Sequence, residues 1–539
     1  MHQEGSLAHL RGTALVVAVA LAAGVAIAEP VPTPKSGGIL RTYNSTNPPS
    51  ASIIEEAAVS TAFSFSGVFN NLLGFDQAKR LAGLDAIVPE LAETWGWDAS
   101  RTKLTIKLRQ GVKWHDGKPF TAKDVQCTWN RILGKDPDEF RKNPRRVWWH
   151  NLKEVTINGD FEATFVLDKP QPAFPVLIAS NMSPVYPCHV PAKDMRSKPV
   201  GTGPFKFGQF DSNRVVKLVK NTEYWKPGLP YLDGVEITIV ASRSTRILAF
   251  SANEFDLTFV SDVTAPLMAD VMARSPKATC RFVPIGASTN LIVNRTKPPF
   301  DNAQLRRAMS LALDRQAMID TVSGGKASIA GAMLPLPEGK WGMPKEVLTA
   351  LPGYGGDMGV RRAEARKIME GLGYGPNKRL KVKVATRDWQ VWKDPAVLLV
   401  DQLNQIHFDA ELEVIESSVW FGRVTKHDYA VGLNLTGSAV DDPDVNLFEN
   451  YACKSERNYT GYCNPRVDEL LGAQSREADI DKRKRIVWEI EKLLIEDAAR
   501  PIIFHGREAT CWHPHFKGLV KHENTTYNNW RFESVWLDK

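Results

Sequence analysis

The sequence lacks the motifs that mark the commonest reaction centres. Its 539 residues contain no G-x-S-x-G nucleophile motif, no P-loop, no H-E-x-x-H metal motif and no EF-hand loop. The segment GTGPFKFG at 201–208 is rich in glycine, but Pro204 removes a backbone donor where a phosphate loop needs one. These absences argue against an enzyme, so we expect no catalytic residue, no metal site and no cofactor.

Histidine is scarce, with 11 residues. His513 and His515 stand in an HPH motif, but no Cys, Asp or Glu nearby completes a set of ligands at metal spacing. His115 and Asp116 occur in HDG, which we interpret as a turn, because no third group orients them as a catalytic pair. Neither histidine motif is therefore assigned a chemical role.

Cysteine is scarce too, and its six residues form no C-x-x-C motif. Cys453 and Cys463 flank the polar loop KSERNYTGY, which one disulfide would close, so they are a candidate pair. Cys127 lies on a predicted helix, where we expect a buried free thiol. The pairing of Cys188, Cys280 and Cys511 stays open.

The uncharged run from Thr13 to Ala28 is too short for a membrane span, which needs ~20 residues. It follows Arg11 and ends in A-I-A, the layout of a signal peptide. Because no Cys lies near that cleavage site, we expect no lipid anchor. The sequence therefore predicts a signal peptide at 1–28 and an exported, periplasmic protein.

Charge of neither sign dominates the chain. The net charge is +7, with 24% charged and 43% hydrophobic residues, which is an ordinary globular mixture. We expect the two densest basic runs, 141–146 and 482–485, to be solvated surfaces. No DNA or RNA motif accompanies them, so no nucleic-acid partner is expected. A chain of this length predicts two or more domains.

Strand and helix patterns alternate along most of the chain. Residues 103–108 alternate apolar and charged side chains, which is typical of a strand with one buried face. Thr121, with Asp124 three residues later, predicts the start of a helix. Helical spacing of apolar residues follows Asp301 and recurs at 396–406 and 480–497. This alternation indicates an α/β protein.

Several segments resemble one family. PELAETWGWDASRTKLTIKLRQGVKWHDGKPFTAKDVQCTWNRI at 89–132 is similar to the signature region of the family 5 extracellular solute-binding proteins. These are dipeptide, oligopeptide and nickel receptors of ABC importers. Further similar segments lie, in order, at 200–225, 290–319, 365–374, 442–451 and 499–506. The resemblance covers nearly the whole chain after the predicted signal peptide.

The resemblance implies a type II periplasmic-binding fold with two lobes and three domains. Domain I would comprise 30–85, 200–288 and 509–539, domain II would be an insertion at 86–199, and domain III would be 289–508. Strands near 288–294 and 507–510 would form the hinge. The implied function is delivery of a peptide-like or other polar organic solute to an inner-membrane ABC permease, by a monomer that encloses the solute between its lobes.

The sequence departs from the family where peptide receptors hold a free amine. In those receptors a W-x-A-D-Y-x-D-P segment supplies an Asp for the peptide's ammonium group. TGSAVDDPD at 436–444 is the corresponding segment here, with Thr436 at the Trp position and Ala439 at the Asp position. Without that carboxylate a buried ammonium loses its partner. Only a shift of register would let Asp441 replace it.

The resemblance places further residues at the cleft. The loop after the first strand would contribute Tyr43, Asn44 and Thr46, and a second loop would contribute Arg387, Asp388, Trp389 and Trp392. Trp389 and Trp392 could equally be core residues, and Trp420 and Phe421 could line the cleft or pack beneath it. Asn434, Thr436 and Ser438 would supply neutral hydrogen-bonding groups. We expect a less zwitterionic solute, such as a blocked peptide, an opine-like conjugate or a sugar derivative.

Two alternatives remain open at this point. A periplasmic hydrolase on the same scaffold would need a nucleophile and a base in the cleft, and the sequence displays no such pair. A receptor for nickel or a metal chelate is the other alternative, although histidines are sparse near the predicted cleft.

Overall fold

The strands and helices alternate as the sequence predicts, and they build three separate larger sheets. The computed structural model describes residues 33–260 and 262–539, and the predicted signal peptide at 1–28 lies outside these ranges. Within them, no helix combines the length and the apolar character needed to cross a membrane. Lys35–Lys539 form one unit, which is described below.

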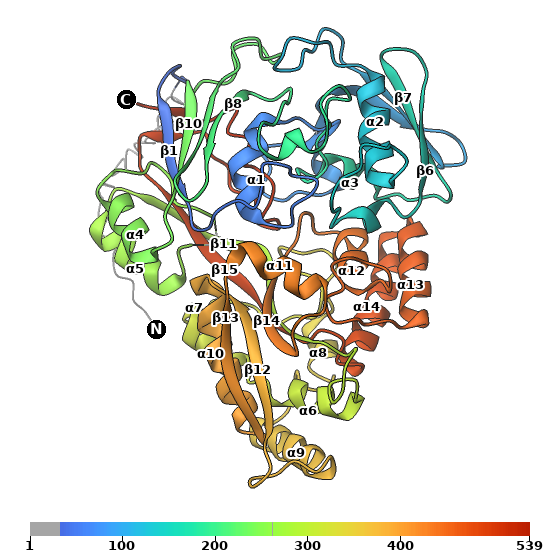
Figure 1. Ribbon diagram of the computed structural model, residues 1–539, viewed down its shortest axis with the longest axis vertical. Helices are drawn as coiled ribbons and strands as arrows, with labels where there is room; N and C mark the ends of the chain where they lie inside the picture. The colour runs from blue at the N-terminus through green and yellow to red at the C-terminus, as the bar shows by residue number, and fades with distance from the viewer. Residues whose placement is uncertain (1–32, 261) are drawn as a thin grey trace, which may run out of the picture. The chain divides into compact units, whose positions relative to one another are not determined.

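The first sheet has four strands in the order β1-β10-β9-β8 (Figure 1). β1 pairs in parallel with β10, and the other neighbours are antiparallel. The strands are β1 (Ile39–Asn44), β8 (Phe205–Asp211), β9 (Val215–Lys220) and β10 (Gly234–Ile239). Other elements from the segments predicted as domain I are α1 (Val59–Phe65), β2 (Leu73–Phe75), α4 (Arg243–Ser251), α5 (Ala265–Arg274), β16 (Phe516–Lys517) and β17 (Trp536–Leu537).

The second sheet is antiparallel, in the order β4-β5-β7-β6, and all its strands come from the segment predicted as the inserted domain. Its elements are β4 (Ala92–Trp97), β5 (Lys103–Leu108), α2 (Ala122–Leu133), β6 (Leu152–Ile157), β7 (Glu162–Leu167) and α3 (Phe174–Ala179), preceded by β3 (Ile87–Pro89). The alternation in β5 is confirmed, because Leu104, Ile106 and Leu108 are buried. The predicted capping box of Thr121 and Asp124 is also present at the start of α2.

Trp114 is the aromatic anchor between β5 and α2. Its indole N–H donates to the Asp124 carboxylate at 3.3 Å, and the same carboxylate accepts the backbone N–H of Thr121 at 2.9 Å. Its other oxygen accepts the backbone N–H of Cys188 at 2.9 Å. One buried carboxylate therefore joins the turn, the helix start and a distant loop.

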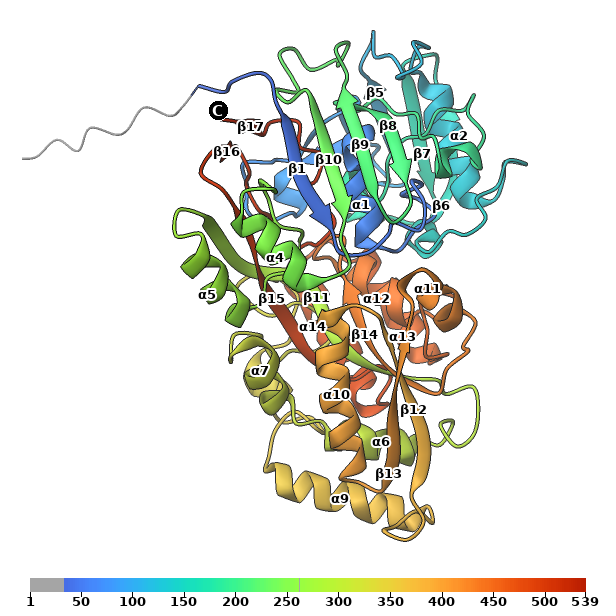
Figure 2. The same ribbon diagram turned by 60° about the vertical axis from the view of Figure 1, so that its left-hand side comes forward.

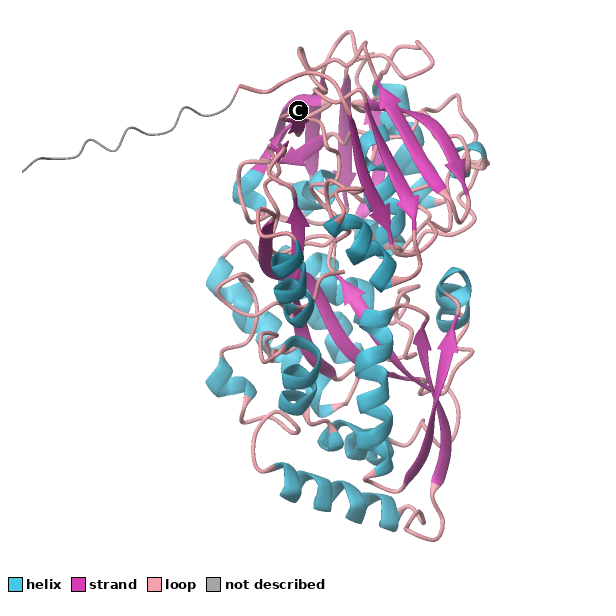
Figure 3. Cartoon of the chain, turned by 90° about the vertical axis from the view of Figure 1, so that its left-hand side faces the viewer, coloured by secondary structure: helices cyan, strands magenta, loops and turns pink. Residues whose placement is uncertain are grey.

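The third sheet has the order β13-β12-β14-β11-β15, and helices cover it (Figure 3). Its strands are β11 (Thr279–Val293), β12 (Leu380–Arg387), β13 (Phe408–Ile415), β14 (Val431–Gly437) and β15 (Ile502–Trp512). The helices are α6 (Ala303–Ala312), α7 (Arg315–Ser323), α8 (Lys345–Leu348), α9 (Met358–Gly371), α10 (Gln390–Asn404), α11 (Ser417–Thr425), α12 (Pro443–Tyr451), α13 (Pro465–Arg476) and α14 (Ile480–Glu496). The three helices predicted after Asp301, at 396–406 and at 480–497 correspond to α6, α10 and α14.

β11 and β15 are long strands that connect the two lobes (Figure 2). The first lobe contains the two four-stranded sheets, and the second lobe contains β12, β13 and β14 with the helices around them. Their pairing runs from Thr279 opposite Trp512 to Asn290 opposite Ile502, with an irregularity between Pro284 and Ser288. Past that irregularity β11 pairs with β14 of the second lobe. Gly286 lies at the irregularity with a φ of 60°, and a Cβ there would approach Thr525 to 2.8 Å. The resemblance places the hinge strands near this position, at 288–294 and 507–510, and a hinge there stays a prediction.

All six cysteines form disulfides. The predicted Cys453–Cys463 pair is confirmed. The expected free thiol of Cys127 is wrong, because α2 presents it to Cys188, with which it is bonded. The third disulfide joins Cys280 to Cys511, which are opposite residues of β11 and β15.

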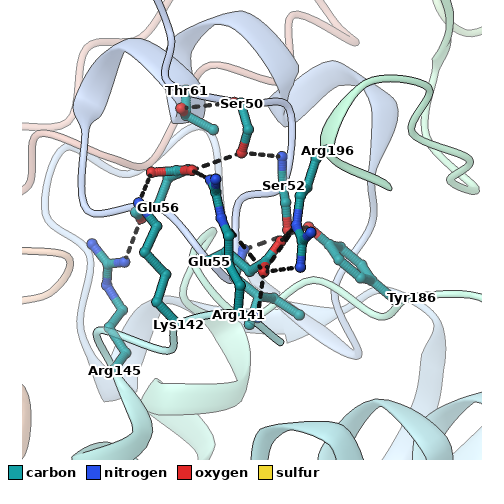
Figure 4. A network of polar contacts seen from close by, with 11 residues as sticks. Ser50, Ser52, Glu55, Glu56, Thr61, Arg141, Lys142, Arg145, Tyr186 and Arg196 are labelled. Atoms are coloured by element: carbon teal, nitrogen blue, oxygen red, sulfur yellow. Dashed lines mark hydrogen bonds and ion pairs between the residues drawn. The ribbon is translucent and has the colours of Figure 1, made fainter. Parts of the chain in front are cut away.

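The basic run at 141–146 is not simply a solvated surface, as the sequence led us to expect. Arg141 and Lys142 bind the buried carboxylate of Glu56 (Figure 4). Arg196 binds the neighbouring Glu55 through Nε at 3.0 Å. In the second basic run, Arg483 is buried and forms a two-pronged ion pair with Asp442, at 2.7 and 3.0 Å. Buried carboxylates, which composition does not reveal, explain these differences.

We predict that the Cys280–Cys511 disulfide contributes more stability than Cys453–Cys463. The two close loops of very different length, with sequence separations of 231 and 10 residues. In the chain-entropy account the corresponding double Cys→Ser variants should differ by about 3 kcal/mol in the free energy of unfolding. Urea unfolding of both variants tests this, and equal losses would contradict it.

Candidate ligand-binding site

Arg387 is the last residue of β12, and its side chain is buried among aromatic rings. The guanidinium carbon lies 5.5 Å from the ring centre of Trp389, 5.5 Å from that of Trp392 and 5.4 Å from that of Phe421. Only 3% of the residue is exposed. The rings give the cation an attractive face but accept no conventional hydrogen bonds.

No carboxylate of residues 33–260 or 262–539 lies within ion-pair distance of Arg387. Its one hydrogen bond to a side chain runs from Nη2 to the Thr46 hydroxyl at 3.4 Å, and its Nε has no acceptor among these residues. Burial lowers the pKa of Arg387 to about 10, which still leaves it charged at neutral pH. A buried guanidinium in this state has unused capacity for an anion.

Arg387, Trp389 and Thr46 are the predicted site residues that the structure brings together across the two lobes. Thr46 follows β1 of the first lobe, whereas Arg387 and Trp389 belong to the second. The Trp389 ring also meets Phe259 of the first lobe, with ring centres 6.0 Å apart. At the place where the lobes meet, the Arg387 cation therefore lies among aromatic side chains.

Thr436, Ser438 and Asp441 come together elsewhere, in a cavity of about 20 Å³ that has room for water only. Arg500 reaches it and donates to Asn290, Asn450 and Thr436 at 2.7–2.9 Å. Asp441 accepts the backbone N–H of Lys340 at 2.7 Å through one oxygen. Its other oxygen has no partner in the part of the chain that the structure describes.

Five other predicted site residues make contacts within the protein itself, and their role at the ligand stays a prediction. The Tyr43 hydroxyl donates to Asp262 at 2.8 Å, and the Asn44 amide donates to the Ser60 carbonyl at 3.0 Å. The Asn434 amide donates to Thr436 at 3.1 Å. Trp420 is fully buried against Trp392. The Asp388 side chain is 55% exposed and pairs with Lys393.

Ala439 lies under a C-terminal segment that the sequence did not point to. Its carbonyl accepts hydrogen bonds from Thr525 at 2.7 Å and from Asn528 at 3.0 Å. The Tyr527 ring covers the neighbouring Gly437, where an added Cβ would meet it at 3.2 Å. The place of the amine-binding Asp is therefore packed against protein. Only the small residues of TGSA at 436–439 indicate that another segment approaches so closely.

These features define a class of protein: a two-lobed α/β binding protein whose lobes meet over buried polar groups. Residues 86–458 match the bacterial extracellular solute-binding proteins, family 5 middle region. The chain therefore belongs to the family 5 bacterial extracellular solute-binding proteins. The predicted resemblance is confirmed, and with it the general function of binding a solute for transport.

Curated relatives and solved structures agree with this assignment. The chain is 25% identical over 485 residues to di/tripeptide-binding protein 1 of Pseudomonas aeruginosa, covering 81% of this chain and 83% of the relative. It is 24% identical to the oligopeptide-binding protein AppA of Bacillus subtilis over 461 residues, 80% of each chain. The structure of AgaA with agropinic acid, from A. tumefaciens R10, superposes with a TM-score of 0.81 at 22% identity, covering 93% of this chain and 99% of that one. This structural match confirms the type II periplasmic-binding fold.

We predict a pH-dependent effect of Asp441→Asn. Burial raises the pKa of Asp441 to about 7, so the folded protein keeps a proton that the unfolded chain releases above pH ~4. This contribution to stability is present below that pH and is lost as pH rises through 7. The variant should therefore gain at least ~1 kcal/mol of unfolding free energy relative to wild type between pH 5 and pH 9. Urea unfolding measures it, and a difference independent of pH would refute it.

Proposed function

We propose that this protein is the periplasmic receptor of an ABC importer and that it binds a carboxylate-bearing, peptide-like or other polar organic solute. The observation that carries the proposal is Arg387, a buried guanidinium with no carboxylate partner among the described residues. A planar guanidinium matches a carboxylate with two parallel hydrogen bonds. The solute would thus complete an ion pair that the protein leaves open.

The proposal also explains why the lobes close. Arg387 and Trp389 belong to the second lobe and Thr46 to the first, so a solute carboxylate at Arg387 also lies next to Thr46. Contacts of one solute with both lobes stabilise the closed state relative to the open state. The permease then recognises a monomer that has closed around its solute. Recognition therefore requires differential binding only, with no bond of the solute broken.

The missing amine partner narrows the class of solute. Ala439 stands at the position of the family's amine-binding Asp, and Thr525 and Asn528 cover it. An ammonium buried there would have no carboxylate to offset its desolvation. We therefore favour solutes whose amine is blocked or absent, such as acylated peptides or opine-like conjugates. The agropinic acid complex of AgaA fits this range. The names of the relatives describe di/tripeptide and oligopeptide binding, and Ala439 is the residue for which we propose a different preference here.

The first test is Arg387→Met. Because it removes the anion partner, we expect affinity for N-acetyl-Ala-Ala to fall at least ~30-fold in calorimetric titration. Because it also removes a buried charge, the solute-free variant should unfold with a free energy equal to wild type or higher by ~1 kcal/mol. Loss of binding together with a stability gain separates a ligand contact from a structural ion pair.

Arg307→Met is the matched control, since Arg307 is an exposed second-lobe arginine that pairs with Glu364. It should leave binding unchanged and alter stability by less than ~1 kcal/mol. Unchanged binding in Arg387→Met would overturn the carboxylate assignment.

A second test compares Ala-Ala with N-acetyl-Ala-Ala on the wild-type protein. The acetylated peptide should bind more tightly, because only it avoids an unpaired buried ammonium. Low micromolar binding of the free dipeptide would argue against the assignment. Native mass spectrometry of freshly purified protein would identify a solute that co-purifies.

A further inference from the structure

A second buried guanidinium lies where the lobes meet. Arg145 precedes a short turn at 146–149 in the predicted inserted domain and is 3% exposed. Its Nη1 donates to the carbonyl oxygen of Glu56 at 2.9 Å. Nε and Nη2 have no hydrogen-bond acceptor among the described residues. Trp148 and Tyr527 flank the cation, with ring centres 5.6 and 5.3 Å from its central carbon.

Glu449, on α12, is the carboxylate nearest to Arg145, and another arginine already uses it. One Glu449 oxygen lies 3.9 Å from Nε of Arg145. The same oxygen accepts a direct hydrogen bond from Arg457, which is equally buried. One carboxylate thus faces two guanidinium groups, so it cannot compensate both.

Tyr527 flanks Arg145, with its ring centre 5.3 Å from the guanidinium carbon. Its hydroxyl donates to the Ala57 carbonyl at 3.0 Å, so it keeps its proton and adds no negative charge. Among the described residues, Glu449 is the one carboxylate within ion-pair distance of Arg145, Arg457 or Arg387, so around these three cations positive charge exceeds negative charge by two.

We propose that Arg145 forms a second anion site, so that the solute carries two anionic groups, one held by Arg387 and the other by Arg145. This inference rests on the proposed function and extends it. The class of solute is a dicarboxylate without a free ammonium group, such as an acylated acidic dipeptide or an opine-like conjugate. A solute with two carboxylates would balance the excess charge and satisfy the free donors of both arginines.

The second anion site would also make closure of the lobes depend on the charge of the solute. Arg145 comes from the lobe that contains the inserted domain, whereas Arg387 and Arg457 come from the opposite lobe. Like charges on facing surfaces oppose approach when no anion is present. A dianion that bridges them removes this repulsion and supplies contacts to both lobes.

Two pairs of probes test the proposal on the full-length mature protein. N-acetyl-Ala-Glu is compared with N-acetyl-Ala-Gln, and N-succinyl-Ala with its terminal amide, so each pair differs by one carboxylate. In calorimetric titration we expect the diacid of at least one pair to bind tenfold or more tightly than its amide. Equal affinities within both pairs would overturn the second anion site and leave Arg145 as a contact between lobes.

The variant Arg145→Gln tests whether Arg145 causes the difference in affinity between each acid and its amide. It should reduce the acid-to-amide ratio to near one while leaving affinity for the amide nearly unchanged, whereas Arg387→Met should weaken acid and amide alike. Arg146→Gln is the matched control, because Arg146 is the exposed neighbour in sequence and should keep the ratio. A ratio that survives Arg145→Gln would also overturn the assignment.

The outcomes separate this inference from the function on which it rests. If wild type binds none of the four probes, the carboxylate assignment of Arg387 fails, and the second site fails with it. If the probes bind but the acid and the amide of each pair have equal affinity, only the proposal of the second anion site fails. If Arg145→Gln does not fold, the wild-type ratio decides the matter by itself.

Discussion

A cation buried without a counterion is the constraint around which the cleft is organised. Removing a guanidinium from water costs several kcal/mol, and hydrogen bonds or an anion must offset that cost. At Arg387, three aromatic rings and one long hydrogen bond to Thr46 offset only part of it. In the proposed receptor, a solute carboxylate would offset the remainder, so the lobes would close more readily with solute than without it.

Other buried arginines of the scaffold do have carboxylate partners. Arg246 forms a two-pronged ion pair with Asp262, which also accepts the Tyr43 hydroxyl. In the other lobe Arg483 pairs with Asp442 at the start of α12. These compensated pairs are structural, and their completeness distinguishes them from Arg387 and Arg145. This contrast is the basis for proposing Arg387 and Arg145 as residues that face the solute.

Local features of the fold could be read from the sequence, whereas long-range pairing could not. The alternation of β5 and the capping box of α2 involve neighbours in the chain, so residue types alone predicted them. The Cys453–Cys463 disulfide closes a short loop and was predicted for the same reason. Cys127 pairs with Cys188 across 61 residues, and no local pattern shows that α2 faces that loop.

The family resemblance could point to residues of the candidate site, but it could not predict which charges there lack a partner. The family resemblance placed Arg387 and Thr46 at the cleft, and the structure brings them together. It could not show that the Asp388 side chain points to solvent or that Tyr527 packs over Gly437. Arg145 stands in a run of basic residues, and its burial depends on which lobe faces it. Net charge along a sequence does not reveal which cations lack a partner in space.

The covalent link between β11 and β15 has a mechanical consequence. Cys280 and Cys511 tie the two crossing strands together on the first-lobe side of the irregularity near Gly286. Strands joined in this way cannot slide or separate there. If the lobes move about these strands, as the family resemblance implies, bending would concentrate beyond the cross-link, in the residues around Gly286.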